Sequence, residues 1–199
     1  ISGAGNINSN SGVGVNAQAS GGGNVSVNLS GDVNGAVGGV LAQSKGGDVT
    51  INATGKVTGG DGIIATTDGV GAVTVTSGAG KVTGTKGDGI DALTMDGWNT
   101  VNVGAGGVTG ARSGVVAVAQ GKGSVKVQVH GDVTGGTDYG VAATSNVGSV
   151  EIDIDAGKFV TGGKAGVLMQ TRSGVATLNN AGTINGVGEG AAGHGHPSV

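Results

Sequence analysis

The sequence predicts an all-β protein: a right-handed parallel β-helix, or solenoid, of about seven coils of about 25 residues, with three short strands per coil. Three observations predict this fold. Glycine supplies 48 of the 199 residues and only three are aromatic, so a core filled with aromatic side chains is not expected. Val and Ile alternate with polar residues in short runs such as 125–129 and 150–154, as in half-buried strands. A motif of glycine, Val or Ile, any residue and alanine recurs every 23 to 27 residues.

The first strand of each coil begins with this motif. Its glycine stands at positions 14, 39, 62, 89, 114, 140 and 166, and the last copy has Met169 in place of alanine. Because successive side chains of a strand point to opposite faces, the Val/Ile and Ala positions point inward together. The expected inward columns are Val15, Val40, Ile63, Ile90, Val115, Val141 and Val167, and Ala17, Ala42, Ala65, Ala92, Ala117 and Ala143.

The second and third strands complete the coil. The second supplies an apolar pair: Val25/Val27, Val49/Ile51, Val73/Val75, Val101/Val103, Val125/Val127, Val150/Ile152 and Ala176/Leu178. The third reads Val-Thr-Gly in five coils, with Asn in place of Thr at both ends, and its apolar column is Ile7, Val33, Val57, Val82, Val108, Val133, Val160 and Ile184. Stacked coils bury one continuous core that a single coil could not bury.

The solenoid is expected to span residues 1–190, followed by a flexible C-terminal tail over residues 191–199. The tail holds His194 and His196, which we interpret as part of a frayed end and not as metal ligands. Residues 1–5 are neutral and glycine-rich, and no apolar run approaches the roughly 18 residues of a membrane span. Targeting segments are therefore expected outside this stretch, and the solenoid itself is not expected to insert into a membrane.

The outward face of the second strand is expected to be polar. One column is Ser26, Thr50, Thr74, Asn102, Lys126, Glu151 and Thr177, and its neighbour is Asn28, Asn52, Thr76, Gln128, Asp153 and Asn179. Lys126 and Glu151 should then lie side by side on adjacent coils, as a surface ion pair worth about 0 to 1 kcal/mol.

The outward face of the first strand is different, because it carries large apolar residues. Leu41, Ile64, Val116 and Leu168 share one column, and Leu93 and Val118 share the next. Soluble monomers seldom leave such a strip open, so these six residues, the apolar strip, are the candidate partner-docking or self-association face. Apolar residues scattered under turns or flanking segments are the alternative. Trp98 and Tyr139 are candidate aromatic anchors beside this strip.

Catalytic and metal sites are not indicated. Glu151, Asp153 and Asp155 alternate along one strand roughly 7 Å apart, a spacing that paired-carboxylate glycoside chemistry could use, but no aromatic platform accompanies them. Asp61 and Asp88 would stack in adjacent coils, and turn-forming Asp-Gly explains both without a calcium ion. We therefore expect no enzyme activity and no cofactor.

Composition excludes further classes. The net charge is −3 without a basic stripe, so nucleic acid is not an expected partner. The chain has no cysteine, which removes disulfide frameworks and fits a chain that crosses an oxidising compartment unfolded.

The repeated Gly-Asp-Gly-Ile-x-Ala at 60–65 and 87–92, followed by Val-x-Val and Val-Thr-Gly, resembles the β-helical passenger domains of Gram-negative autotransporters. The resemblance spans about residues 3–186. It implies type V secretion, with the passenger displayed on or shed from the outer membrane and acting in adhesion, host-cell signalling or self-aggregation. The membrane barrel and enzymatic insertions of that family do not appear in this sequence.

The sequence therefore favours a secreted or surface-displayed binding module, an adhesin or virulence factor that contacts a host-cell surface protein or matrix component. A structural stalk or self-associating spacer is the alternative. A polysaccharide-cleaving β-helix enzyme is less favoured, because the coils lack long loops that could form the walls of a cleft.

Overall fold

The computed structural model describes residues 1–187 and 189–194, and it confirms the predicted fold. All regular structure in these residues is β-strand, and the strands form three parallel eight-stranded sheets, here named A, B and C. None of the described residues forms a helix of the length and apolarity that a membrane span needs.

Sheet A contains β1 (Ser2–Gly3), β4 (Val25–Leu29), β7 (Val49–Ala53), β10 (Val73–Ser77), β13 (Asn99–Val103), β16 (Val125–Val129), β19 (Val150–Ile154) and β22 (Ala176–Asn180). Sheet B contains β2 (Ile7–Ser9), β5 (Val33–Gly35), β8 (Val57–Gly59), β11 (Val82–Gly84), β14 (Val108–Gly110), β17 (Val133–Gly135), β20 (Phe159–Gly162) and β23 (Thr183–Gly186). Sheet C contains β3 (Val13–Ala19), β6 (Gly38–Ser44), β9 (Asp61–Thr67), β12 (Ile90–Thr94), β15 (Val115–Ala119), β18 (Tyr139–Ser145), β21 (Ala165–Thr171) and β24 (Glu189–His194).

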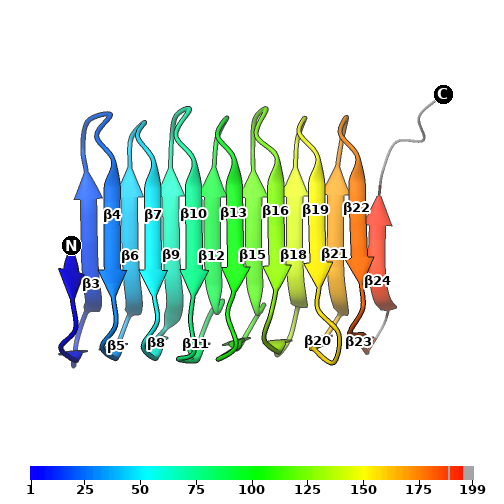
Figure 1. Cartoon of the computed structure of the whole chain (residues 1–199). Helices are drawn as coiled ribbons and strands as arrows, with labels where there is room; N and C mark the ends of the chain where they lie inside the picture. Colours follow the sequence, from blue (N-terminus) through cyan, green and yellow to red (C-terminus); the bar gives the residue numbers. More distant parts are fainter. Residues whose placement is uncertain (188, 195–199) are drawn as a thin grey trace.

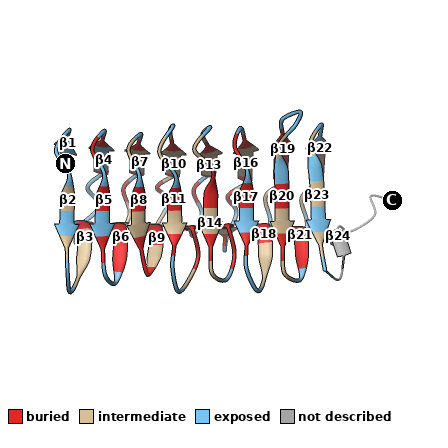
Figure 2. Ribbon diagram, turned by 90° about the horizontal axis from the view of Figure 1, so that it is seen from below, coloured by how far each residue is buried: buried red, intermediate tan, exposed pale blue. Residues whose placement is uncertain are grey.

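Each complete coil runs through sheet C, then sheet A, then sheet B. Strands β3 to β23 make seven such coils, numbered here from the N-terminus, with β1 and β2 as a partial leading coil and β24 beginning an eighth. The chain descends through sheet A in front and returns upward through sheet C behind while it advances from the N-terminus to the C-terminus, so the winding is right-handed (Figure 1). Figure 2 shows sheet B from below, with sheet A along one side and sheet C along the other.

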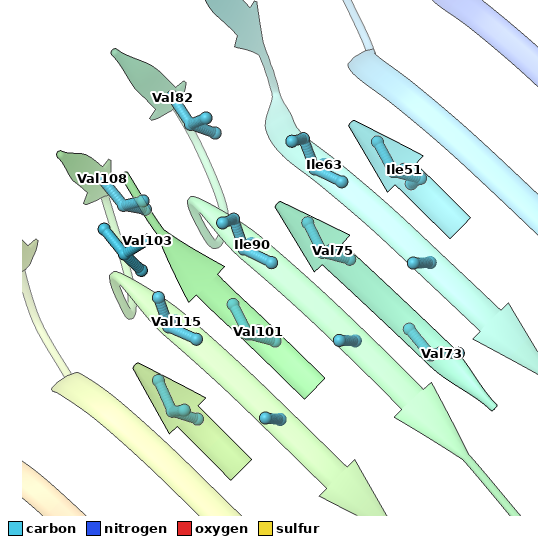
Figure 3. Packing of buried hydrophobic residues seen from close by; sticks show 14 of the residues in the cluster. Ile51, Ile63, Val73, Val75, Val82, Ile90, Val101, Val103, Val108 and Val115 are labelled. Atoms are coloured by element: carbon cyan, nitrogen blue, oxygen red, sulfur yellow. The ribbon is translucent and has the colours of Figure 1, made fainter. Parts of the chain in front are cut away.

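The core is built from stacked columns of identical or similar residues. In sheet C, Val40 pairs with Ile63, Ile63 with Ile90, and Ile90 with Val115, so the predicted inward column is confirmed. These side chains and the alanine column beside them are almost fully buried. Figure 3 shows valine and isoleucine side chains of the three sheets packed together in the interior. Because strands of neighbouring coils lie about 4.8 Å apart, each small branched side chain fills the space above the one before it.

Steric contacts explain the glycine of the Val-Thr-Gly motif. A Cβ atom at Gly110 would overlap the backbone carbonyl oxygen of Ser113, where the chain turns from sheet B into sheet C. The anchor glycine has a similar role, since a Cβ atom at Gly89 would overlap the side chain of Val108. Both glycines are therefore required by the close approach of the chain at this corner.

Coil four corrects one predicted register. Strand β13 begins at Asn99, which pairs with Val73 and Val125, so Val101 pairs with Val75 and not with Val73. In consequence Asn102 belongs to the second outward column of sheet A, and Thr100 takes its place in the first. Asn99 is fully buried, and its amide nitrogen donates hydrogen bonds to the carbonyl oxygens of Ala92 (2.7 Å) and Val118 (3.0 Å).

The C-terminal boundary also differs from the prediction. Residues 191–194, which were expected to belong to a flexible tail, form the greater part of β24, whose backbone pairs with β21 from Ala165↔Glu189 to Gln170↔His194. The rest of the predicted tail, residues 195–199 with His196, lies outside the described residues.

Candidate binding face

The outer face of sheet C carries the apolar strip. Leu41 pairs with Ile64, and Asp91 lies between Ile64 and Val116, so the first predicted column is continuous across these coils. It continues through Ala142 to Leu168, and Leu93 lies beside Val118 in the neighbouring column. All six residues of the strip are half-buried, because each is covered on two sides by its neighbours in the column.

Among the described side chains of the two outward columns of sheet C, Asp91 is the one that carries a charge. It replaces an aliphatic residue in coil four, the middle coil of the seven, and no hydrogen bond to its carboxyl group is present among the described residues. Burial raises the pKa of Asp91 to about 6, and the nearby carboxylates of Asp88 and Asp61 add to the increase, while Arg112 opposes it. The face therefore holds one poorly solvated, unpaired carboxyl group within an apolar surface.

Asp88 lies beside this face, but its charge is satisfied within the coil corner. Its side chain is 5% exposed and accepts a hydrogen bond from the guanidinium group of Arg112 (2.7 Å). Its other oxygen accepts from the backbone N–H of Ser113 (2.9 Å). In turn, the Asp61 carboxylate accepts a hydrogen bond from the backbone N–H of Asp88 (2.8 Å). The stacked pair predicted from the sequence therefore links the corners of successive coils by hydrogen bonds from backbone N–H groups to aspartate side chains.

Two shallow depressions flank coil four where sheet C turns into sheet A. One, of about 200 Å³, is lined by polar side chains that include Gln18, Gln43 and Lys45. The other, of about 340 Å³, is lined by Val118, Thr144 and Arg172, among others. The apolar strip is therefore bordered along this edge by amide, hydroxyl and basic groups.

Trp98 lies on the corner between sheets C and A in coil four, and 63% of its surface is exposed. Since Asn99 begins β13 and points into the core, the preceding indole is left outside. Sequence reasoning missed exposed valines on the same corner, Val70, Val147 and Val175. These exposed valines could have been recognised from the sequence, because each lies next to a glycine in a turn and belongs to none of the inward columns.

Tyr139 does not join Trp98 in one cluster. Tyr139 is the first residue of β18, at the corner where the chain passes from sheet B into sheet C. Trp98 lies at the opposite corner, where the chain passes from sheet C into sheet A. The ammonium group of Lys164 lies 5.8 Å from the centre of the Tyr139 ring and 2.6 Å from the carboxylate of Asp138. Tyr139 is thus engaged within the corner, and Trp98 is the more accessible of the two candidate anchors.

The carboxylates on sheet A are paired with basic groups. Lys126 contacts Glu151 (3.0 Å), as predicted, and also Asp153 (3.2 Å), while His130 contacts Asp155 (2.8 Å). Among the described residues, no group of three or more His, Cys, Asp and Glu side chains could hold a metal ion. The charged side chains on this part of sheet A are therefore paired with one another at the solvent-exposed surface.

Comparison of the chain with protein-family models, curated protein sequences and solved structures finds no match.

Proposed function

We propose that this solenoid is a secreted or surface-displayed binding module, the passenger of a Gram-negative autotransporter, whose sheet C face docks on a host-cell surface protein or matrix component. The observation that carries this proposal is the contrast between the faces. The outward columns of sheet A are hydroxyl, amide and charged groups, and the central outward column of sheet B is Thr and Asn, with Phe159 as one exposed apolar side chain beside it, whereas sheet C presents the apolar strip.

The dimensions of the face suit a specific interface. Seven coils at about 4.8 Å and strands of about five residues give roughly 34 by 17 Å. Covering that area would bury on the order of 1,100 Å² over both partners, near the lower bound of specific protein–protein interfaces. Trp98 and the depressions at the corner would extend this area.

Asp91 indicates the chemistry of the partner. A carboxylate that loses water at an interface is costly unless a basic group pairs with it. Asp91 has no such group within the face, so the partner surface should combine apolar side chains with one Lys or Arg placed opposite coil four. Asp91→Asn should then weaken binding about 10-fold or more, the loss of one charge-assisted contact.

Binding of fluorescently labelled protein to cultured animal cells tests the proposal. The test variant changes the four residues of the longer column, Leu41, Ile64, Val116 and Leu168, to threonine. A matched control changes four outward threonines of sheet A, Thr50, Thr74, Thr100 and Thr177, to serine. We expect saturable binding that is lost in the first variant and retained in the second, with both proteins still folded. Failure of the unchanged protein to bind any cell type would instead favour the alternative, a stalk or spacer.

A further inference from the structure

Exposed apolar side chains gather on the corner where the chain turns from sheet C into sheet A. Five large apolar side chains are exposed in coils three to six, and four of them lie on this corner: Val70, Met95, Trp98 and Val147. We call these four residues the C–A ridge. The fifth, Phe159, lies on the corner between sheets A and B. The turns that carry the ridge project side by side along the top of the rod in Figure 1. Apolar side chains that gather in this way mark an interaction surface.

Trp98 occupies a place that neighbouring coils fill with a small residue. The N–H of Val73 donates to the carbonyl of Trp98 (2.9 Å), and the N–H of Asn99 donates to the carbonyl of Ser124 (2.9 Å). Ala72, Trp98 and Ser124 are therefore equivalent positions on three successive coils. Since alanine and serine serve the same backbone ladder, the fold does not require an indole here, and its exposure calls for a contact outside the solenoid.

Backbone hydrogen bonds hold the turns of the ridge beside one another. The N–H of Gly121 donates to the carbonyl of Met95 (2.7 Å), and the N–H of Val147 donates to the carbonyl of Gly121 (3.2 Å). The N–H of Lys122 donates to the carboxylate of Asp96 (3.0 Å). The apolar side chains are therefore presented by turns that are already ordered, so that binding would spend little free energy on ordering the backbone.

The shape of the C–A ridge favours a lipid surface as its partner. The four side chains stand on separate turns of a convex corner and extend over three coil steps, or about 14 Å. A protein would need a groove of matching length to cover them, whereas the headgroup region of a bilayer can deform around each side chain. Tryptophan is enriched at membrane–water interfaces, because its ring is apolar and its N–H group can face the polar headgroups.

The charges on this corner indicate the class of lipid. Coils two to six place Lys45, Lys122, Asp48, Asp68 and Asp96 there. Two ammonium groups against three carboxylates leave no excess of positive charge, which selection of anionic lipids requires. The carboxylates of Asp48 and Asp96 also accept hydrogen bonds from backbone N–H groups of the next coil (2.8 and 3.0 Å), so they are held along the turns. The ridge therefore suits a zwitterionic surface, which it would contact through its apolar side chains.

We propose that the C–A ridge rests on the surface of a zwitterionic phospholipid membrane, with its four side chains in the headgroup region and the rod lying along the membrane. Such side chains reach about 5 to 10 Å into the boundary between headgroups and acyl chains, and the sheets stay outside the hydrocarbon. Sheets A and C rise from the two sides of the ridge, and sheet B lies farthest from the membrane (Figures 1 and 2). In this arrangement Trp98 contacts lipid, while the apolar strip stays open to a protein partner on the same membrane. The inference goes beyond the proposed function and does not depend on it.

Trp98 is the single tryptophan of the chain, so its fluorescence reports on the ridge directly. The probe is a unilamellar phosphatidylcholine vesicle that contains no protein. The emission maximum, and quenching by phosphatidylcholine brominated on its acyl chains, are followed as vesicles are added, and flotation gives the bound fraction. We expect emission to move to shorter wavelength and brominated lipid to quench it. Binding should change less than about two-fold between roughly 0.1 and 0.5 M salt, because charge contributes little.

Three variants and one matched control locate the contact. Trp98→Ser introduces the residue that coil five has at the equivalent position, and it should lower partitioning onto vesicles about 10-fold or more. Val70→Ser should lower it about 3-fold. Phe159→Ser removes an exposed aromatic side chain from another corner and should bind like the unchanged protein. The variant with four threonines in the apolar strip should also bind vesicles normally, which separates this contact from docking on sheet C.

Circular dichroism establishes that each variant is folded before its binding is compared. Unaltered emission in the presence of vesicles would overturn the proposal, and so would a Trp98→Ser protein that floats as well as the unchanged protein. An equal loss of binding in Phe159→Ser and Trp98→Ser would also overturn it, because the contact would then not be specific to the ridge. Binding to cells that depends on the apolar strip, without any binding to protein-free vesicles, would remove the membrane contact and leave the function proposed for sheet C standing.

Discussion

Replacing Asp91 by asparagine removes its charge from the column of the apolar strip with almost no change in side-chain shape. The carboxyl group lies between Ile64 and Val116, and its pKa is about 6, against an ordinary value of 3.8. Between these two values the folded protein retains a proton that the unfolded chain has released. The free energy of unfolding therefore falls as the pH rises through this window.

The size of the effect follows from the same two values. At about 1.4 kcal/mol per pH unit, their difference corresponds to at most about 3 kcal/mol. Asp91→Asn cannot ionise, so it should be more stable than the unchanged protein at pH 8, by up to that amount. For a chain of this length that is at most about 6 to 12 °C in Tm. Below about pH 3 Asp91 is largely protonated in both states, and the two proteins should unfold at nearly the same temperature.

Thermal unfolding followed by circular dichroism at about pH 3 and pH 8 measures this difference. Asp68→Asn, at an exposed carboxylate on the corner after β9, is the matched control. For each variant, the change in Tm between the two pH values is subtracted from the change in Tm of the unchanged protein. The difference gives the contribution of the replaced carboxyl group alone, without that of the other acidic residues. The reasoning would be refuted if Asp91→Asn and the unchanged protein differed in Tm by the same amount at both pH values.

Two further changes test the packing at the corner between sheets B and C, each by urea denaturation. Gly110→Ala should lower the free energy of unfolding by more than about 2 kcal/mol, because the added Cβ atom would overlap backbone that cannot move aside. Gly21→Ala is the control: no atom lies within 4 Å of its added Cβ atom, so the free energy of unfolding should change by less than about 0.5 kcal/mol. Equal effects of the two changes would contradict the steric explanation. Arg112→Ala should cost about 1 to 3 kcal/mol because it leaves the buried Asp88 carboxylate with one fewer donor, and adding Asp88→Asn should restore part of the loss.

Most of the fold could be predicted because each inward column repeats one residue type. Stacked parallel coils place equivalent residues of successive repeats side by side, so aligning the repeats of the sequence predicts the register of the strands in each sheet. Coil four was the exception: Val101 and Val103 resemble the apolar pairs of other coils, and Asn99 looked like part of a turn. Its burial depends on two carbonyl groups from neighbouring strands, at Ala92 and Val118, that no local pattern reveals.

The strands that carry the apolar strip could be predicted from the sequence, but the environment of its charged residue could not. Alternation assigned the apolar strip to one face, and the register of sheet C follows that assignment. The environment of Asp91 depends on charges at the coil corners. Spacing predicted that Asp61 and Asp88 stack there, but it did not predict that Asp88 is buried against Arg112 and close enough to Asp91 to raise its pKa. Likewise, the contact between Tyr139 and Lys164 joins residues 25 positions apart on neighbouring coils.

Site-directed occlusion of the sheet C face would show whether this face is the binding surface. The chain has no cysteine, so a single introduced cysteine can be labelled with a maleimide polymer at one chosen place. Thr144→Cys lies on the outer face of sheet C beside Val118, and Thr74→Cys lies on the outer face of sheet A. We expect the label at position 144 to abolish saturable binding to cells and the label at position 74 to leave it unchanged. Equal binding by the two labelled proteins would mean that the sheet C face is not the binding surface.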